Sequence, residues 1–212
     1  MRDNAPYQIV KTGEPMTTIR RISAVAVLIT AVAAMAAKKA PTAPGKYAEW
    51  GPDIDSIEIV KTFRFADYSK VVVQPLDTSS TPKAEEADMV EKVEKVAANA
   101  TAPFLEGVKK GVPDAALASS PVSAGLIVRG KVTTLDPGSR AKRMWVGYGA
   151  GAARTAIEGE IVDAKTGQVL VRFTQERRSG IERLGRGSSY EEIMKRNLTA
   201  IGEDVANLLK EF

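Results

Sequence analysis

Three glycines alternate with other residues in the middle of the chain, at Gly147, Gly149 and Gly151. The bare backbone N–H groups of such a run can cradle a phosphate. A dinucleotide site, however, needs a strand before its glycines and a helix after them, and both flanks here have the composition of strands. The pattern therefore favours close backbone approach, a bulge or a subunit contact over nucleotide binding.

Basic and aromatic side chains interleave with these glycines. Such a pattern can bind a polyanion, and it is also typical of a solvated loop or of a Trp that faces the core. We expect an envelope protein, a second copy of the chain or an anionic membrane surface as the partner, and do not favour nucleic acid. The predicted partner-binding residues are Arg140, Lys142, Arg143, Trp145, Gly147, Tyr148, Gly149 and Gly151.

Two other groups of charged residues could form sites. The first is a basic run that is typical of a solvated surface and could contact acidic partners. The second is a set of closely spaced carboxylates, which could form an acid/base pair but are predicted to be exposed loop charges. The basic run is Arg172, Glu176, Arg177, Arg178, Glu182, Arg183 and Arg186, and the carboxylates are Asp53, Asp55 and Glu58.

The chain contains no Cys and no His among its 212 residues. This excludes zinc sites built on Cys or His, Cys nucleophiles and Ser/His/Asp triads. An enzyme would have to use carboxylate, Lys, Tyr or Ser/Lys chemistry, and no constellation of that kind is evident. We therefore predict no catalytic residues, no metal and no cofactor.

The N-terminal region has the pattern of a secretory signal. Arg20 and Arg21 precede an apolar run that ends in Ala34-Met35-Ala36, a small-residue motif typical of signal peptidase cleavage. Residues 16–37 are the predicted signal peptide, with an uncleaved anchor as the alternative, and residues 1–15 are a predicted upstream extension. The predicted signal peptide has no Cys at its end to carry a lipid. Removing the residues before Ala37 lowers the formal charge of the chain from +4 to +2.

The rest of the chain predicts one α/β domain over residues 67–212, after a tether and irregular segment over residues 38–66. Strands are expected at 70–74, 124–135, 152–162 and 169–175. A helix should begin at Thr81-Pro82, restart at Pro103 and end near Gly107 and Gly111, and a second should follow a capping box at Ser189 and Glu192. The expected fold is α+β, in the order β-α-β-β-β-α, with about four mixed strands and two main helices on one face.

The stretch from Gly125 to Leu170 has a distinctive order: a strand, Leu-Asp-Pro-Gly-Ser-Arg, Arg143, Val-Gly-Tyr-Gly-Ala-Gly, and a strand that ends at Asp163-Ala-Lys-Thr-Gly167. It resembles the bacterial exported proteins grouped as domain of unknown function 4410. The order of elements is more distantly similar to the periplasmic domains of curli secretion proteins, peptidoglycan synthase activator lipoproteins and the Tol β-propeller protein. The resemblance implies a fold and an envelope location, and no reaction.

These observations predict an exported protein of the periplasm or the outer-membrane periphery. The first hypothesis is a non-enzymatic assembly or partner-binding module, which could be oligomeric. One alternative is a periplasmic enzyme that uses carboxylates or Lys, which would need a deep pocket with two convergent titratable groups. The other is a polyanion-binding protein, which would need the two basic regions to merge into one surface.

Overall fold

The computed structural model describes residues 40–51, 53–82, 84, 87–120, 123–138, 152–179 and 189–212. All of them belong to the second of the two units into which the chain divides, Lys38–Phe212. The predicted signal peptide and upstream extension lie outside the described residues. The buried apolar cluster is drawn from residues 40 to 209, so the second unit has a core of its own.

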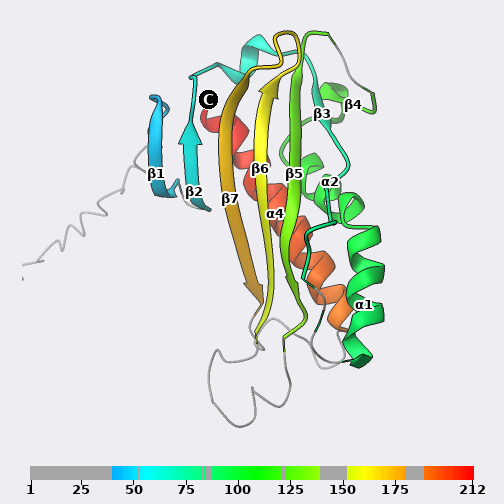
Figure 1. The fold of residues 1–212 in the computed structure, drawn as a ribbon. Coiled ribbons are helices and arrows are strands. Elements are labelled where there is room, and N and C mark those ends of the chain that lie inside the picture. Colours follow the sequence, from blue (N-terminus) through cyan, green and yellow to red (C-terminus); the bar gives the residue numbers. More distant parts are fainter. Residues whose placement is uncertain are drawn as a thin grey trace, which may run out of the picture. The chain divides into compact units, whose positions relative to one another are not determined.

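Seven strands form one mixed sheet in the order β1-β2-β7-β6-β5-β3-β4 (Figure 1). Neighbours from β1 to β5 are antiparallel, and β3 is parallel to both β5 and β4. The strands are β1 (Gly45–Trp50), β2 (Ile54–Ile59), β3 (Val71–Val73), β4 (Leu117–Ala118), β5 (Leu126–Asp136), β6 (Ala153–Asp163) and β7 (Val169–Ser179).

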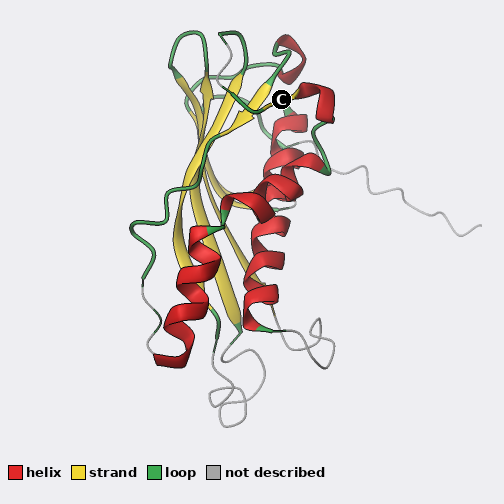
Figure 2. Ribbon diagram, turned by 90° about the vertical axis from the view of Figure 1, so that its right-hand side faces the viewer, coloured by secondary structure: helices red, strands yellow, loops and turns green. Residues whose placement is uncertain are grey.

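In the part of the chain that the structure describes, three α-helices lie on one face of this sheet and none covers the other face, which we call the open face (Figure 2). They are α1 (Ala87–Ala98), α2 (Thr101–Lys109) and α4 (Tyr190–Glu211), and two short 3-10 turns cover Phe65–Asp67 and Asp114–Ala116. The long helix α4 packs on β6, β7 and α2. Its start is fixed by the predicted capping box, in which Ser189 and Glu192 each accept a hydrogen bond from the backbone N–H of the other.

Alternation along the strands separates the two faces of the sheet. In β5, Val128 and Val132 are buried towards the helices, whereas Arg129 and Lys131 point to the open side. The same alternation occurs in β6, where Ile157 and Ile161 are buried, Glu158 is exposed and Glu160 is half-buried. The sequence therefore places the core on one face and a charged layer on the other.

The sheet has three strands more than the four that the sequence predicts. β1 and β2 form within residues 38–66, where the sequence analysis expects a tether and an irregular segment, and they pair with β7 through β2. The third additional strand is β4, which has only two residues and pairs with β3. The local sequence does not predict β1 and β2, because Gly45, Gly51 and the prolines around them are typical of a linker.

The helical region also differs from the prediction at its start. α1 begins at Ala87 rather than at Thr81-Pro82, since the Thr81 hydroxyl donates to the Val132 carbonyl at 2.9 Å instead of capping a helix. The predicted restart at Pro103 is correct, because Pro103 lies in the first turn of α2. Gly107 lies inside α2 rather than at its end.

Candidate functional site

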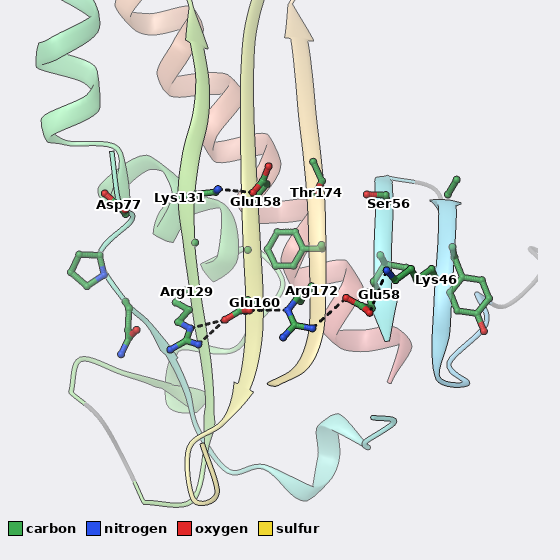
Figure 3. A pocket seen from close by; sticks show the side chains of 18 residues that line it. Lys46, Ser56, Glu58, Asp77, Arg129, Lys131, Glu158, Glu160, Arg172 and Thr174 are labelled. Carbon is green, nitrogen blue, oxygen red and sulfur yellow. Dashed lines mark hydrogen bonds and ion pairs between the residues drawn. The ribbon is translucent and has the colours of Figure 1, made fainter. Parts of the chain in front are cut away.

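A row of five charged side chains crosses the open face of the sheet, one from each of five neighbouring strands (Figure 3). Their positions face one another in the strand register, so cross-strand pairing brings opposite charges together. In strand order the row is Lys46, Glu58, Arg172, Glu160 and Arg129, and we call it the charge row.

Each neighbouring pair in the charge row is an ion pair. Arg129 donates through Nε (3.0 Å) and Nη2 (2.6 Å) to one carboxylate oxygen of Glu160, and Arg172 donates through Nε to the other at 3.0 Å. Arg172 also reaches Glu58 at 3.3 Å, and Lys46 lies 3.7 Å from Glu58. The charges therefore alternate without interruption from β5 to β1.

A second row lies beside the first, two residues further along each strand. Lys131 pairs with Glu158 at 2.9 Å, and the next two positions carry the hydroxyl residues Thr174 and Ser56. Asp77 lies next to Lys131, in a segment whose backbone joins β5 through Asp77 N–H to the Gly130 carbonyl (2.9 Å). This row is thus charged at one end and neutral at the other.

A hollow of about 900 Å³ lies over both rows. Its lining carries four cationic and four anionic side chains, so it has no net charge. The charged residues are Lys46, Glu58, Asp77, Arg129, Lys131, Glu158, Glu160 and Arg172, and Tyr47, Ser56, Gln74, Pro75 and Thr174 are among the others.

The ion pairs favour the charged forms of Glu160, Lys131 and Arg172. Burial opposes ionisation of Glu160, but the hydrogen bonds from Arg129 and Arg172 outweigh it and lower the pKa of Glu160. The hydrogen bond to Glu158 raises the pKa of Lys131, and the bonds to Glu160 and then to Glu58 raise the pKa of Arg172. A carboxylate with a lowered pKa is a poor proton donor near neutral pH, so Glu160 is not suited to act as a general acid.

The three carboxylates singled out from the sequence are not simple exposed loop charges. Glu58 belongs to the charge row, and Asp55 accepts a hydrogen bond from the Glu176 backbone N–H at 2.6 Å. Asp53 accepts from Arg177 Nη2 at 3.1 Å. All three therefore tie β2 and the turn before it to β7.

The basic run of the sequence is divided between the two faces where the structure describes it. Arg177 points to the helical side, where it contacts Asp204 of α4, whereas Arg178 pairs with Glu176. Arg172 lies on the open face in the charge row. These described residues do not form one basic surface, and the remainder of the run falls in residues 180–188, outside the described part.

A smaller hollow, of about 170 Å³, lies at the other side of the sheet and is lined by Asp53 and Asp204 among others. Asp204 is 3% exposed, and burial raises its pKa despite its hydrogen bonds from Arg177 and Gln175. Both of its oxygens are engaged by residues of β7, which indicates a structural role. Among the described residues, no group of Asp and Glu side chains could hold a metal ion.

The eight predicted partner-binding residues, from Arg140 to Gly151, all lie outside the described residues. The strands on either side are described: Arg154 faces Asp136, and Ala153 faces Ser179. The connections over 139–151 and 180–188 therefore leave neighbouring strand ends. The binding role of the eight residues stays a prediction.

The charge row and the hollow above it were not predicted from the sequence. A signal was present, because Arg129 and Lys131 alternate with apolar residues, as do Glu158 and Glu160. That pattern could identify an open face, but the pairing of Arg172 with Glu58 joins positions 114 residues apart.

Within the described part of the chain, no helix has the length and apolar content needed to cross a membrane.

Comparisons with solved structures find folds of limited similarity. The PelC dodecamer from Paraburkholderia phytofirmans is 16% identical, with 69% of this chain and 96% of that chain covered at a TM-score of 0.39. Protein XCC0632 from Xanthomonas campestris is 10% identical, with 69% and 85% covered at a TM-score of 0.37. Lipoprotein GNA1162 from Neisseria meningitidis is 14% identical, with 66% and 97% covered at a TM-score of 0.27.

No curated protein matches the chain in sequence. The family model described as a domain of unknown function, DUF4410, matches residues 59–181 and so confirms the resemblance noted in the segment from Gly125 to Leu170. Since this match spans more than half of the sequence, the chain belongs to the DUF4410 family.

Proposed function

We propose that this protein is an exported, non-enzymatic component of the cell envelope that binds a partner through the open face of its sheet. The observation that supports this proposal is the hollow of about 900 Å³, which extends over five strands and is lined by paired charges. An open hollow that extends over five strands suits a protein partner, whereas a small-molecule site is usually enclosed.

The pairing of the charges argues for binding rather than catalysis. Glu58, Glu158 and Glu160 each form an ion pair with at least one cation, and the lowered pKa of Glu160 makes that carboxylate a poor proton donor near neutral pH. Asp204 has the raised pKa that an acid catalyst would need, but it is held between α4 and β7 by Arg177 and Gln175. An enzyme built on carboxylates is therefore the weaker hypothesis.

Export is proposed from the sequence of residues 16–37. A fusion of residues 1–60 to a phosphatase that is active only outside the cytoplasm should give activity, and replacing Arg20 and Arg21 with Glu should reduce it. Activity that is absent from the unaltered fusion would contradict export.

The binding surface can be tested by placing a photo-crosslinking amino acid on each side of the sheet in cells of the native host. Position 174, in the middle of the hollow, should give a crosslinked product of defined mass. Position 109, an exposed Lys on helix α2, is the matched control and should give none. Equal labelling from both positions, or none from either, would overturn the proposed role of the open face.

The segment that holds the eight predicted residues is proposed to contribute to the same binding. It connects β5 to β6, the two strands that carry one end of the charge row. Gly149→Val should reduce the crosslinked product from position 174 if a backbone must approach this glycine closely. An unchanged product, with the fold intact by circular dichroism, would remove the segment from the binding surface.

A further inference from the structure

The open face carries charge in stripes, because each strand contributes one sign to the two rows. β5 presents Arg129 and Lys131, and β6 presents Glu158 and Glu160. Arg172 of β7, Glu58 of β2 and Lys46 of β1 continue the alternation. The stripes follow the spacing of neighbouring strands, which is about 4.8 Å.

We propose that the partner of this face is a second copy of the chain, placed face to face across a two-fold axis that runs parallel to the strands between β6 and β7. This inference rests on the proposed function, since it names the partner of the same surface. An alternating row is complementary to itself when one copy is turned over about a point between two neighbouring charges. The pattern of stripes is therefore the observation that carries the inference.

The axis between β6 and β7 places opposite charges together for four of the five members of the charge row, and Lys46 lies beyond these pairs. Arg172 of one copy faces Glu160 of the partner copy, and Arg129 faces Glu58. An axis through the middle of the row, at Arg172, would instead place Lys46 against Arg129 and Glu58 against Glu160, which pairs like charges. Complementarity thus requires an axis between two neighbouring strands rather than through a charge. Among these axes, the one between β6 and β7 pairs four charges of the row and also overlaps six of the seven strands of each sheet, whereas an axis between β2 and β7 overlaps only four.

The second row is compatible with the same axis. Glu158 then faces Thr174 of the partner copy, and Lys131 faces Ser56, so each charge meets a hydroxyl and no like charges meet. The strands of the two copies remain aligned, as in ordinary packing of one sheet on another. Neither row therefore opposes this arrangement.

The composition of the face predicts a weak and salt-sensitive dimer. Five strands span about 19 Å, so the contact is at the small end of specific interfaces. The carboxylates of the charge row are about one third exposed, 28% for Glu160 and 36% for Glu58, and water can remain between the sheets.

Charge reversal tests the arrangement on residues 38–212, the unit with its own core. In light scattering at low salt, the unaltered protein should form a dimer that dissociates at high salt. Arg172→Glu should weaken the dimer about tenfold or more, because Glu then faces Glu160 on both sides of the axis. Arg172→Glu combined with Glu160→Arg restores the opposite charges and should restore the dimer.

A matched control is available on the helical side. Lys110→Glu reverses the charge of another exposed ion pair, with Glu203, and should leave the dimer unchanged. A protein that stays monomeric at low salt would overturn the inference, as would a dimer that Arg172→Glu does not weaken.

The absence of Cys from the sequence allows the geometry itself to be tested. The axis brings position 131 of one copy to position 56 of the partner copy, whereas the two positions lie three strands apart, about 14 Å, within one copy. The double variant Ser56→Cys, Lys131→Cys should form covalent dimers with a short bismaleimide, and each single variant should not. Covalent dimers from either single variant, or none from the double variant, would overturn the proposed axis.

These results separate the two proposals. A monomer that still gives a defined photo-crosslinked product with another envelope protein from position 174 would refute the second copy and leave the proposed function standing. Failure of both experiments would refute both.

Discussion

The side chain of Asp204 joins three parts of the described chain. It lies on α4, it accepts hydrogen bonds from Gln175 (2.9 Å) and Arg177 (2.7 Å) of β7, and Arg177 extends to Asp53 before β2. The hydrogen bond to Asp204 raises the pKa of Arg177, whereas burial raises the pKa of Asp204 itself. The raised pKa of Arg177 reflects a well-formed pair, and the raised pKa of Asp204 reflects the free energy that burying its carboxylate costs.

Removing the two partners of this pair should have unequal effects. Arg177→Leu leaves a buried carboxylate with fewer donors and should lower the free energy of unfolding by about 2 to 3 kcal/mol. Asp204→Asn keeps an acceptor and loses the buried charge, so it should cost less than about 1 kcal/mol. Urea denaturation of both variants at neutral pH measures the difference, and equal losses would contradict this account.

Glu160 should respond to pH in the opposite sense to Asp204. Its pKa is lowered in the folded protein, so its stabilising effect is present above its ordinary pKa of 4.5 and is lost as the pH falls through the lowered value. Glu160→Gln should therefore lower the melting temperature slightly at pH 7, by the equivalent of about 0.5 to 1 kcal/mol, and not at strongly acidic pH. A difference from the unaltered protein that persists in acid would rule out this cause.

At the scale of elements, two helices cross at a pair of glycines. A Cβ on Gly202 of α4 would lie 2.1 Å from the Phe104 carbonyl oxygen of α2, and one on Gly107 would lie 1.9 Å from the Thr199 carbonyl oxygen. No larger residue fits unless the helices separate. This close approach keeps α2 and α4 in contact beneath the sheet.

Gly202→Ala should lower the free energy of unfolding by about 2 kcal/mol or more, even though Ala favours helix formation. Glu203→Ala, one residue further along the same helix, removes an exposed ion pair with Lys110 and should change stability by no more than about 0.5 kcal/mol. Denaturation of the two variants under the same conditions compares them. Stabilisation by Gly202→Ala would show that the helices can move apart freely.

Elements with strong local signals could be predicted from the sequence. The capping box at Ser189 fixed the start of α4, and strict alternation located β5, β6 and β7 to within a few residues. β1 and β2 could not be predicted because they are short and are stabilised by pairing with β7, more than 100 residues away. The Thr81 hydroxyl likewise bonds to β5 and so was unavailable as a cap.

At the scale of the whole molecule, the family match and the folded unit do not coincide. The match covers residues 59–181, whereas α4 begins at Tyr190 and β1 precedes Gly51. Met194, Leu198, Ile201 and Val205 of α4 belong to the buried cluster. The matched segment therefore lacks a large part of its own core.

A fragment limited to residues 59–181 should not fold, because it would expose the apolar face of the sheet. The fragment over residues 38–212 is the matched comparison and should unfold cooperatively. Circular dichroism and solubility of the two fragments distinguish them. A stable, soluble short fragment would mean that α4 is not needed to cover the sheet.

The order of the strands also explains why the candidate site was missed. The charge row depends on β7 lying between β2 and β6, an arrangement that joins residues near positions 58, 160 and 172. Sequence patterns can give the face on which a residue lies, but they do not give the neighbour of a strand. The two-faced sheet was therefore predictable, whereas the alternating row was not.

The aromatic contacts of Trp50 provide a built-in optical reporter. Its ring stacks on Phe212 with centroids 5.8 Å apart, and its indole N–H donates to the Pro41 carbonyl at 2.7 Å. The sequence holds one other Trp, at position 145, so Trp145→Phe would leave a single indole emitter at the junction of β1 with the end of α4. A red shift of its emission would then report separation of the first hairpin from the last helix, independently of global unfolding.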